Sequence, residues 1–216
     1  MSWRPLAGPG AAAAMNAHIA EAALRSTGDP ETILEPAALV AELFGDYVAL
    51  RAEQADAQFG WVFERSAEVT LNASGAFSVR VREYGFVGGA HPNTFVRLLS
   101  LDPGTGQPLS LGDLFAGSFQ EPLRALAEVR FREQRGLGAE ASFSDEGLWF
   151  EDDVYRLNDN FSVGLDGLRF YYNNYEIAPY AFGPTEILVP RTALVALVRT
   201  DGPLAPLWAT RPTEEE

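Results

Sequence analysis

The chain has 216 residues, 47% of them hydrophobic, and its 30 acidic against 16 basic residues give a formal net charge of −14. This composition is that of a folded protein with one large domain or two small ones, and it excludes a disordered chain. The acidity disfavours binding to nucleic acid and to anionic membrane surfaces, because both carry charge of the same sign.

Lysine and cysteine are both absent from the sequence. Their absence excludes a Walker A lysine, a Schiff-base lysine, thiol catalysis, disulfides and thiolate metal sites. The longest apolar runs are shorter than the roughly 18 residues that a transmembrane helix requires. We therefore expect no cofactor, no metal site and no transmembrane segment.

Two helices are predicted in the N-terminal part of the chain. Ala11–Leu24 is rich in alanine, and a second helix begins near Pro36, a residue favoured in a first helical turn. The second helix repeats apolar residues at spacings of three and four, which we interpret as a face buried in the core. These residues are Leu39, Val40, Leu43, Phe44, Tyr47 and Leu50.

Alternating apolar and polar residues then predict strands. Trp61–Leu71 and Ala76–Tyr84 are joined by a turn at residues 72–75, and Thr94–Leu101 is a third strand. In the second strand Phe77, Val79 and Val81 point one way, and the intervening polar side chains point the other.

The second half of the chain continues with a helix over Phe119–Arg135, which Gly136 ends. An acidic loop follows, and its residues 145–153 do not match the ligand pattern of a calcium loop. A hairpin (161–172), a strand (186–189) and a short helix (191–199) complete the order of elements.

Short turns between neighbouring strands favour an α+β fold, with a mainly antiparallel sheet packed against helices. We divide the chain into a helical segment with the first strand (1–68), a domain packed with it (69–200) and a flexible acidic tail (201–216).

Two loops are the candidate binding sites. The first has two glycines and a histidine after a strand, and the second is rich in tyrosine, the residue that interfaces favour. The candidate residues are Gly88, Gly89, His91, Asn93, Tyr175, Glu176, Pro179 and Tyr180. The alternative is purely structural: a glycine turn, a hydrogen-bonded histidine, and tyrosine hydroxyls bonded to the backbone.

No catalytic residue is predicted. The sequence contains no Gly-x-Ser-x-Gly elbow, and its two histidines, His18 and His91, lack metal-ligand spacing. Nothing in the sequence pairs two of its carboxylates, as glycoside hydrolysis would require.

Residues 84–115, which read YGFVGGAHPNTFVRLLSLDPGTGQPLSLGDLF, are the most informative stretch of the chain. Together with FYYNNYEIAPYA at 170–181 and the strand that follows, they resemble the RsiV-like domain of unknown function, from about Val69 to Arg199. The resemblance implies an α+β fold and an extracytoplasmic location. Members include the ectodomain of an anti-sigma factor that binds lysozyme, a companion region of a peptidoglycan deacetylase, and lipoproteins.

From this resemblance we expect a non-catalytic binding module of the bacterial cell envelope that recognises a protein or a cell-wall glycan. Lysozyme binding or inhibition is one alternative, because lysozyme is usually basic and this chain is acidic. A carbohydrate-active enzyme that uses acidic residues is another. The start Met-Ser-Trp-Arg-Pro is compatible with removal of a signal peptide or lipid anchor, and the sequence shows no sigma-binding segment.

Overall fold

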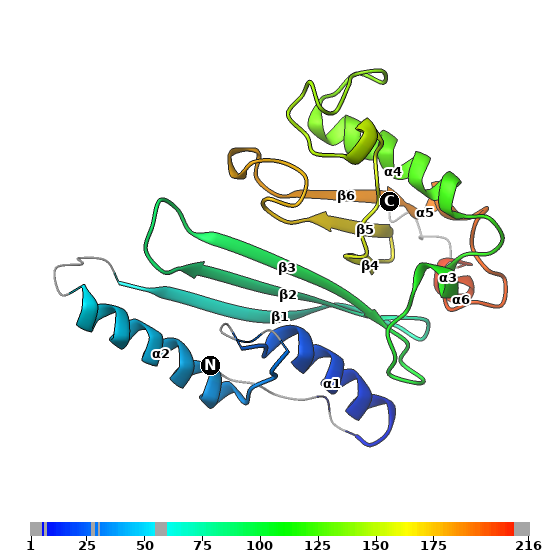
Figure 1. Ribbon diagram of the computed structural model, residues 1–216. Coiled ribbons are helices and arrows are strands. Elements are labelled where there is room, and N and C mark those ends of the chain that lie inside the picture. Colours follow the sequence, from blue (N-terminus) through cyan, green and yellow to red (C-terminus); the bar gives the residue numbers. More distant parts are fainter. Residues whose placement is uncertain (1–5, 7, 27–28, 30, 55–59, 210–216) are drawn as a thin grey trace, which may run out of the picture.

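The computed structural model describes residue 6, residues 8–26, residue 29, residues 31–54 and residues 60–209. It confirms the α+β class, but its strands divide between two three-stranded antiparallel sheets (Figure 1). The first sheet has the order β1-β2-β3 and the second the order β4-β5-β6. The strands are β1 (Val62–Asn72), β2 (Phe77–Phe86), β3 (Asn93–Leu101), β4 (Phe161–Val163), β5 (Gly167–Tyr172) and β6 (Thr185–Pro190).

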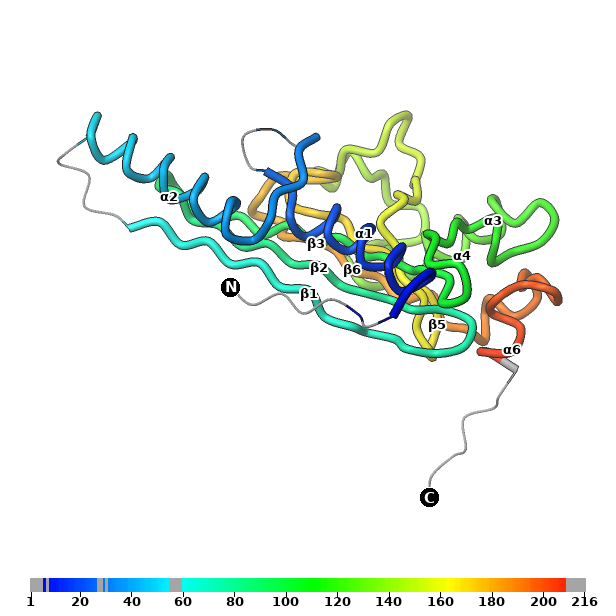
Figure 2. The backbone as a smooth tube through the Cα atoms, turned by 90° about the horizontal axis from the view of Figure 1, so that it is seen from below, coloured from blue at the N-terminus to red at the C-terminus, as the bar shows by residue number. Residues whose placement is uncertain are grey.

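Helices cover the outer sides of the two sheets. Figure 1 shows α1 and α2 along the first sheet and α4 along the second, and Figure 2 shows α1 and α2 in front of the first sheet. The α-helices are α1 (Ala11–Ala23), α2 (Pro36–Glu53), α3 (Leu111–Leu114), α4 (Gln120–Arg135), α5 (Arg191–Leu194) and α6 (Leu204–Ala209). Two short 3₁₀ turns, η1 (Glu151–Asp153) and η2 (Tyr180–Phe182), lie in loops.

The helix α1 and the first sheet form one core. Met15, Ile19 and Ala23 follow at intervals of four, so they share one face of α1 and are buried. This face packs on the predicted apolar side of β2, which Phe77 and Val79 help to form. The opposite side of β2 faces the second sheet, since the Ser78 hydroxyl donates a 2.8 Å hydrogen bond to the Val163 carbonyl.

The larger core lies between the second sheet and α4. Phe131 of α4 is fully buried among aromatic rings, with centroid distances of 5.2 Å to Tyr155 and 5.9 Å to Tyr172. The two tyrosine hydroxyls are 2.8 Å apart, and that of Tyr172 donates to the Arg156 carbonyl. Burial raises the pKa of both tyrosines, because an apolar environment disfavours the phenolate.

The C-terminal part of the chain differs from the sequence-based expectation. The helix expected over 191–199 is limited to α5, and the segment expected to be flexible contains α6. Leu204 of α6 is fully buried, and the Trp208 indole donates a 2.9 Å hydrogen bond to the Gly164 carbonyl. Apolar burial therefore orders residues 204–208, while residues 210–216 lie outside the described part.

The expected division of the chain at residue 69 falls inside β1, which runs from Val62 to Asn72. Most of β1 pairs with β2 on both sides of this point, so α1 and the first sheet belong to one packed body. Within the described residues, no helix is both long and apolar enough to cross a membrane.

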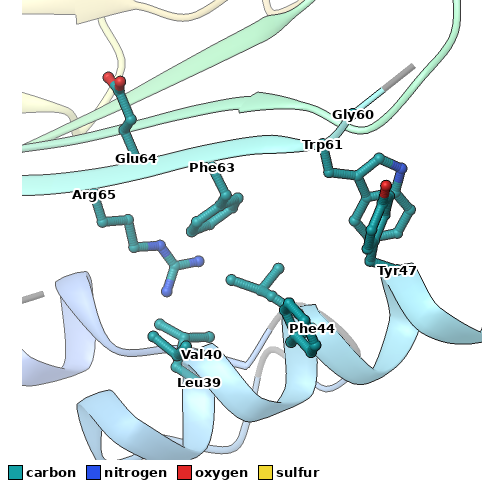
Figure 3. A pocket seen from close by; sticks show the side chains of 10 residues that line it. Leu39, Val40, Phe44, Tyr47, Gly60, Trp61, Phe63, Glu64 and Arg65 are labelled. Atoms are coloured by element: carbon teal, nitrogen blue, oxygen red, sulfur yellow. The ribbon is translucent and has the colours of Figure 1, made fainter. Parts of the chain in front are cut away.

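The prediction that one face of α2 is buried in the core is wrong for part of that face. Leu39 is 1% exposed, but Val40 is 50% exposed and Phe44 is 66% exposed. Apolar residues surround more than half of the helix axis, so a single sheet cannot cover them all. An open groove of about 560 Å³ separates α2 from the start of β1, and Tyr47, Trp61 and Phe63 also line it (Figure 3).

Candidate functional site

The two predicted loops meet at one end of the molecule. The loop at residues 88–93 joins β2 to β3, and the loop at residues 175–182 lies between β5 and β6. We call them together the paired-loop surface. The His91 ring stacks on the Tyr180 ring at a centroid distance of 3.5 Å and an angle of 13°. The Tyr175 hydroxyl lies 3.1 Å from His91 Nε2. Thus the structure brings together side chains more than 80 positions apart in the sequence.

The hydrogen-bond partners of His91 indicate the tautomer of a neutral ring. Its Nδ1 lies 2.9 Å from the Pro92 carbonyl, which can only accept, so Nδ1 carries the proton and donates. The other ring nitrogen is then free to accept from the Tyr175 hydroxyl. The Tyr180 hydroxyl also donates to the Pro92 carbonyl, at 2.8 Å. A neutral histidine is therefore satisfied at both nitrogens.

Tyr175 is held in a conformation that tyrosine rarely adopts. Its φ is +65°, and its side chain is 52% exposed. Glu176 holds the turn, because its carboxylate accepts hydrogen bonds from the Asn173 backbone N–H (2.7 Å) and the Asn158 amide (2.6 Å). Glu176 is thus a structural member of the candidate set, and it holds the exposed tyrosine in place.

The remaining candidates have smaller parts in this geometry. Gly88 and Gly89 both have positive φ, +88° and +105°, which explains why the loop requires glycine there. Asn93 accepts a long hydrogen bond of 3.4 Å from the Asn174 amide. Pro179 is exposed and precedes η2. All four lie on or beside the paired-loop surface.

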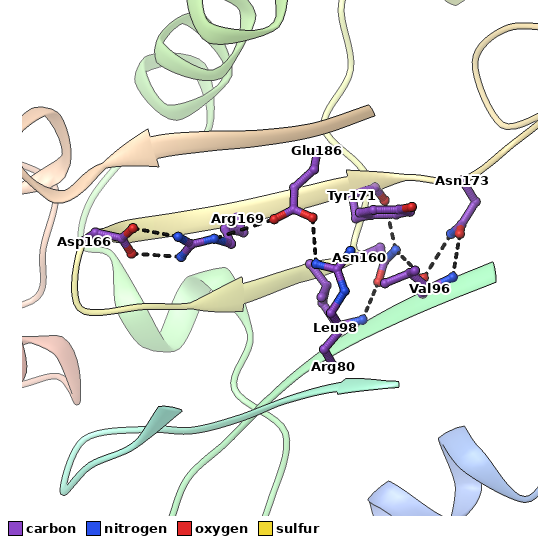
Figure 4. Close-up of polar contacts among 9 residues, drawn as sticks. All are labelled: Arg80, Val96, Leu98, Asn160, Asp166, Arg169, Tyr171, Asn173 and Glu186. Carbon is purple, nitrogen blue, oxygen red and sulfur yellow. Dashed lines mark hydrogen bonds and ion pairs between the residues drawn. The ribbon is translucent and has the colours of Figure 1, made fainter. Parts of the chain in front are cut away.

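Two asparagines that no sequence pattern marks, one before β4 and one after β5, attach the second sheet to the first (Figure 4). The Asn173 side chain accepts from the Val96 N–H at 2.7 Å and donates to the Val96 carbonyl at 3.1 Å. Asn160 accepts from the Leu98 N–H at 2.8 Å and donates to the Val96 carbonyl at 2.9 Å. These amides take the place of a neighbouring strand along the outer edge of β3.

Ion pairs reinforce the same junction between the sheets (Figure 4). Arg80 of β2 contacts Glu186 of β6 at 2.6 Å, and Glu186 lies 3.6 Å from Arg169 of β5. Arg169 also forms a bidentate pair with Asp166, at 2.8 and 2.6 Å. The pairing of Arg80 with Glu186 spans 106 residues, so no local pattern could have predicted it.

A shallow groove of about 610 Å³ lies beside the paired-loop surface. Phe95 and Arg97 of β3 form one wall, and residues 173–176 contribute to the other. The groove leads to the exposed ring of Tyr175. It gives the paired-loop surface a concave neighbour that a ligand could enter.

The described residues form neither a metal-ligand cluster nor a contact between a histidine and a serine. Within them no group of three or more histidine, cysteine or acidic residues could hold a metal ion. Over the same ranges, neither histidine hydrogen-bonds to a serine: His18 lies 3.9 Å from Glu21, and His91 is bonded as above. This arrangement does not form a serine–histidine dyad.

Residues 112–192 match the model of DUF3298, a family described as a protein of unknown function. Over these residues the chain is similar to that family. The match includes the loop with Tyr175 and Tyr180 but begins after the loop with His91. The expected resemblance from about Val69 to Arg199 is therefore supported at the level of this family over 112–192.

Two curated mycobacterial proteins align with about the same share of the chain. Immunogenic protein MPT64 of Mycobacterium tuberculosis is 31% identical over 127 residues, which are 57% of this chain and 53% of MPT64. Esterase Rv3036c of the same organism is 32% identical over 123 residues, 56% of this chain and 51% of the esterase. The alignments span about half the length of these relatives.

Solved structures share the fold. A DUF3298 family member from Bacteroides fragilis superimposes with a TM-score of 0.70 at 24% identity, covering 93% of this chain and 83% of that one. A DUF3298 family protein from Pseudomonas aeruginosa has a TM-score of 0.53 at 23% identity, covering 70% and 68%. Because the first superposition covers nearly the whole chain, the likeness in fold extends beyond residues 112–192.

Proposed function

We propose that this chain is a non-catalytic binding module of the bacterial cell envelope, located outside the cytoplasm, which recognises a protein or a cell-wall glycan through the paired-loop surface. The observation that carries the proposal is the cluster of His91, Tyr175 and Tyr180, which two loops distant in the sequence build together. Exposed aromatic rings on a firmly held backbone provide contact area at a low cost in conformational entropy.

The hydrogen bonds of this cluster favour recognition over catalysis. Both nitrogens of His91 are engaged, by a carbonyl and by a phenol, and neither partner is a carboxylate that would support a general base. The ring faces and the edge of Tyr175 are what the surface offers to a ligand. Such faces stack on sugar rings and pack against protein side chains.

Co-sedimentation with purified peptidoglycan and calorimetry with a c-type lysozyme test the proposal. We expect one of the two probes to bind, and the Tyr175→Ala, Tyr180→Ala double variant to lose that binding while remaining folded. Phe44→Ala is the matched control, because Phe44 is an exposed aromatic residue on α2, far from the loops in sequence. Binding to neither probe, or binding that survives the double substitution, would refute the proposal.

Lysozyme binding or inhibition is the more specific form of this proposal. Its support is the net charge of −14, which complements a basic partner and speeds association. Calorimetry at moderate salt separates it from glycan binding: heat with lysozyme, together with inhibition of its activity, favours this form. Heat that disappears as salt is added, without any inhibition, indicates non-specific attraction and removes it.

A hydrolytic function is the second candidate, since Esterase Rv3036c aligns with 123 residues of this chain. A carbohydrate-active enzyme would instead use acidic residues, and Glu176 beside the groove is already engaged in two hydrogen bonds. Turnover of a p-nitrophenyl ester or of soluble peptidoglycan fragments tests both. Turnover that is lost in His91→Ala or Glu176→Gln would replace the binding proposal with an enzymatic one.

A further inference from the structure

Three arginines converge in a second depression, on the α1 side of the first sheet. It measures about 370 Å³ and lies between the C-terminal end of α1 and the strands β1 to β3. Arg25, Arg65 and Arg97 line it, together with Asn93, Phe95 and one carboxylate, that of Glu83. Such a gathering of positive charge stands out in a chain whose net charge is −14.

Two of these arginines have partners in the protein. Arg65 pairs with Glu83 and also donates to the backbone carbonyls of Ala23 and Arg25 at the end of α1. Arg25 pairs with Glu21 at 2.6 Å. These contacts hold both guanidinium groups in fixed positions at the wall of the depression.

Arg97 differs from them. Among the described residues its side chain has no hydrogen bond and no ion pair, and its guanidinium carbon lies 5.3 Å from the Phe95 ring centroid. The side chain is half-buried, and burial, followed by the charge of Arg25, lowers its pKa. By contrast Arg80 and Arg132, which are also partly buried, each reach a carboxylate within 3 Å. Glu83 and Glu21 attract Arg97 only from a distance, because they pair with Arg65 and Arg25, so no carboxylate contacts the Arg97 guanidinium.

A desolvated guanidinium beside two others is unfavourable without an anion. We propose that this depression is a binding site for the oxyanion of a small organic ligand, a carboxylate or a phosphate, with Arg97 as the main contact. A guanidinium matches either group, because its planar fork donates two parallel hydrogen bonds. The Phe95 ring and the Asn93 amide contact the remainder of the ligand, since the volume exceeds that of a bare ion.

The position of the site connects it with the paired-loop surface. Arg97 and Phe95 also line the 610 Å³ groove that leads to Tyr175, and Asn93 is in contact with Asn174 of the second loop. An acidic ligand bound at Arg97 would thus lie at the rim of the candidate recognition surface. The anion site itself rests on the arginines alone and does not depend on the proposed function.

Calorimetric titration at constant ionic strength, with chloride as the balancing ion, tests the site. The probes are inorganic phosphate and glucuronate, and glucose is the uncharged match for glucuronate. We expect saturable binding of at least one oxyanion, no binding of glucose, and a loss of about tenfold or more in affinity for Arg97→Gln. Response to phosphate alone or to glucuronate alone identifies which oxyanion the site takes.

The matched control is Arg156→Gln, an exposed arginine paired with Glu151 outside the depression, which should bind like the wild type. Without oxyanions, Arg97→Gln should unfold at the same temperature as the wild type or higher, because it removes repulsion between like charges. Absence of saturable oxyanion binding, or equal affinity in Arg97→Gln and wild type, overturns the proposal. A variant that loses peptidoglycan or lysozyme binding but keeps oxyanion binding reports on the paired-loop surface and leaves the anion site unaffected.

Discussion

Replacing Asn173 by alanine should destabilise the protein far more than the same change at the neighbouring Asn174. Asn173 is 6% exposed and makes two hydrogen bonds to the backbone of Val96, which is 1% exposed. Each lost hydrogen bond costs about 0.5–1.5 kcal/mol, and a buried backbone group left without a partner raises this further. We expect the free energy of unfolding to fall by about 2–4 kcal/mol.

The control and the assay follow from the same contacts. Asn174 makes a single side-chain hydrogen bond, at 3.4 Å to Asn93, so Asn174→Ala should cost less than about 1 kcal/mol. Urea denaturation gives both values from the shift of the midpoint at an unchanged slope. Equal destabilisation of the two variants would show that Asn173 does not carry the edge of β3 in the way its hydrogen bonds imply.

Three further perturbations test other features. Tyr175→Gly should be more stable than Tyr175→Ala by about 1 kcal/mol in urea denaturation, because only glycine adopts φ +65° without strain; equal stability would contradict this. Gly106→Ala should unfold the protein or lower the free energy of unfolding by about 3 kcal/mol or more, since its Cβ would lie 2.3 Å from the Ala11 carbonyl oxygen. Gly89→Ala, whose Cβ would have no atom within 4 Å, should lower it by only about 1 kcal/mol. Thermal melts comparing the two variants measure this difference. Burial raises the pKa of Tyr172 above the ordinary value of 10.0, so the unfolded state loses its proton first and stability should fall above pH 10, by up to about 1.4 kcal/mol per pH unit for this group. Melting temperatures that stay constant there would contradict the burial of Tyr172.

Local signals in the sequence predicted much of the fold. The alternation in β2, the turn after β1 and the glycine that ends α4 all lie where expected, and Gly136 adopts the left-handed conformation, with φ +68°. These features depend on neighbours in the chain, which a sequence shows directly. The same holds for the positive φ of Gly88 and Gly89.

Contacts between distant segments could not be predicted in this way. The division of the strands into two sheets depends on Asn160 and Asn173, which act as a substitute strand for β3, and an isolated asparagine in a loop has no distinguishing pattern. Likewise α6 is ordered because Trp208 reaches the Gly164 carbonyl, although the surrounding tail looks polar.

For the candidate site, the composition of the sequence identified the two loops, but it did not predict that they contact each other. Glycine and tyrosine content marked them, whereas the stacking of His91 on Tyr180 depends on the positions of two different sheets. Arg97 was not selected, because a single arginine in a strand reads as a solvated residue until its neighbours are known. Sequence reasoning is thus strongest for residues with an unusual backbone conformation. It is weakest for residues whose role depends on neighbours that are distant in the sequence.

A map of amide chemical-shift changes, recorded by NMR on the intact protein during titration with soluble peptidoglycan fragments and, separately, with a c-type lysozyme, tests the central claim most directly. The account predicts that the largest changes fall in residues 88–93 and 173–182, where His91, Tyr175 and Tyr180 come together. Changes concentrated instead along the groove between α2 and β1, or no changes with either probe, would contradict it.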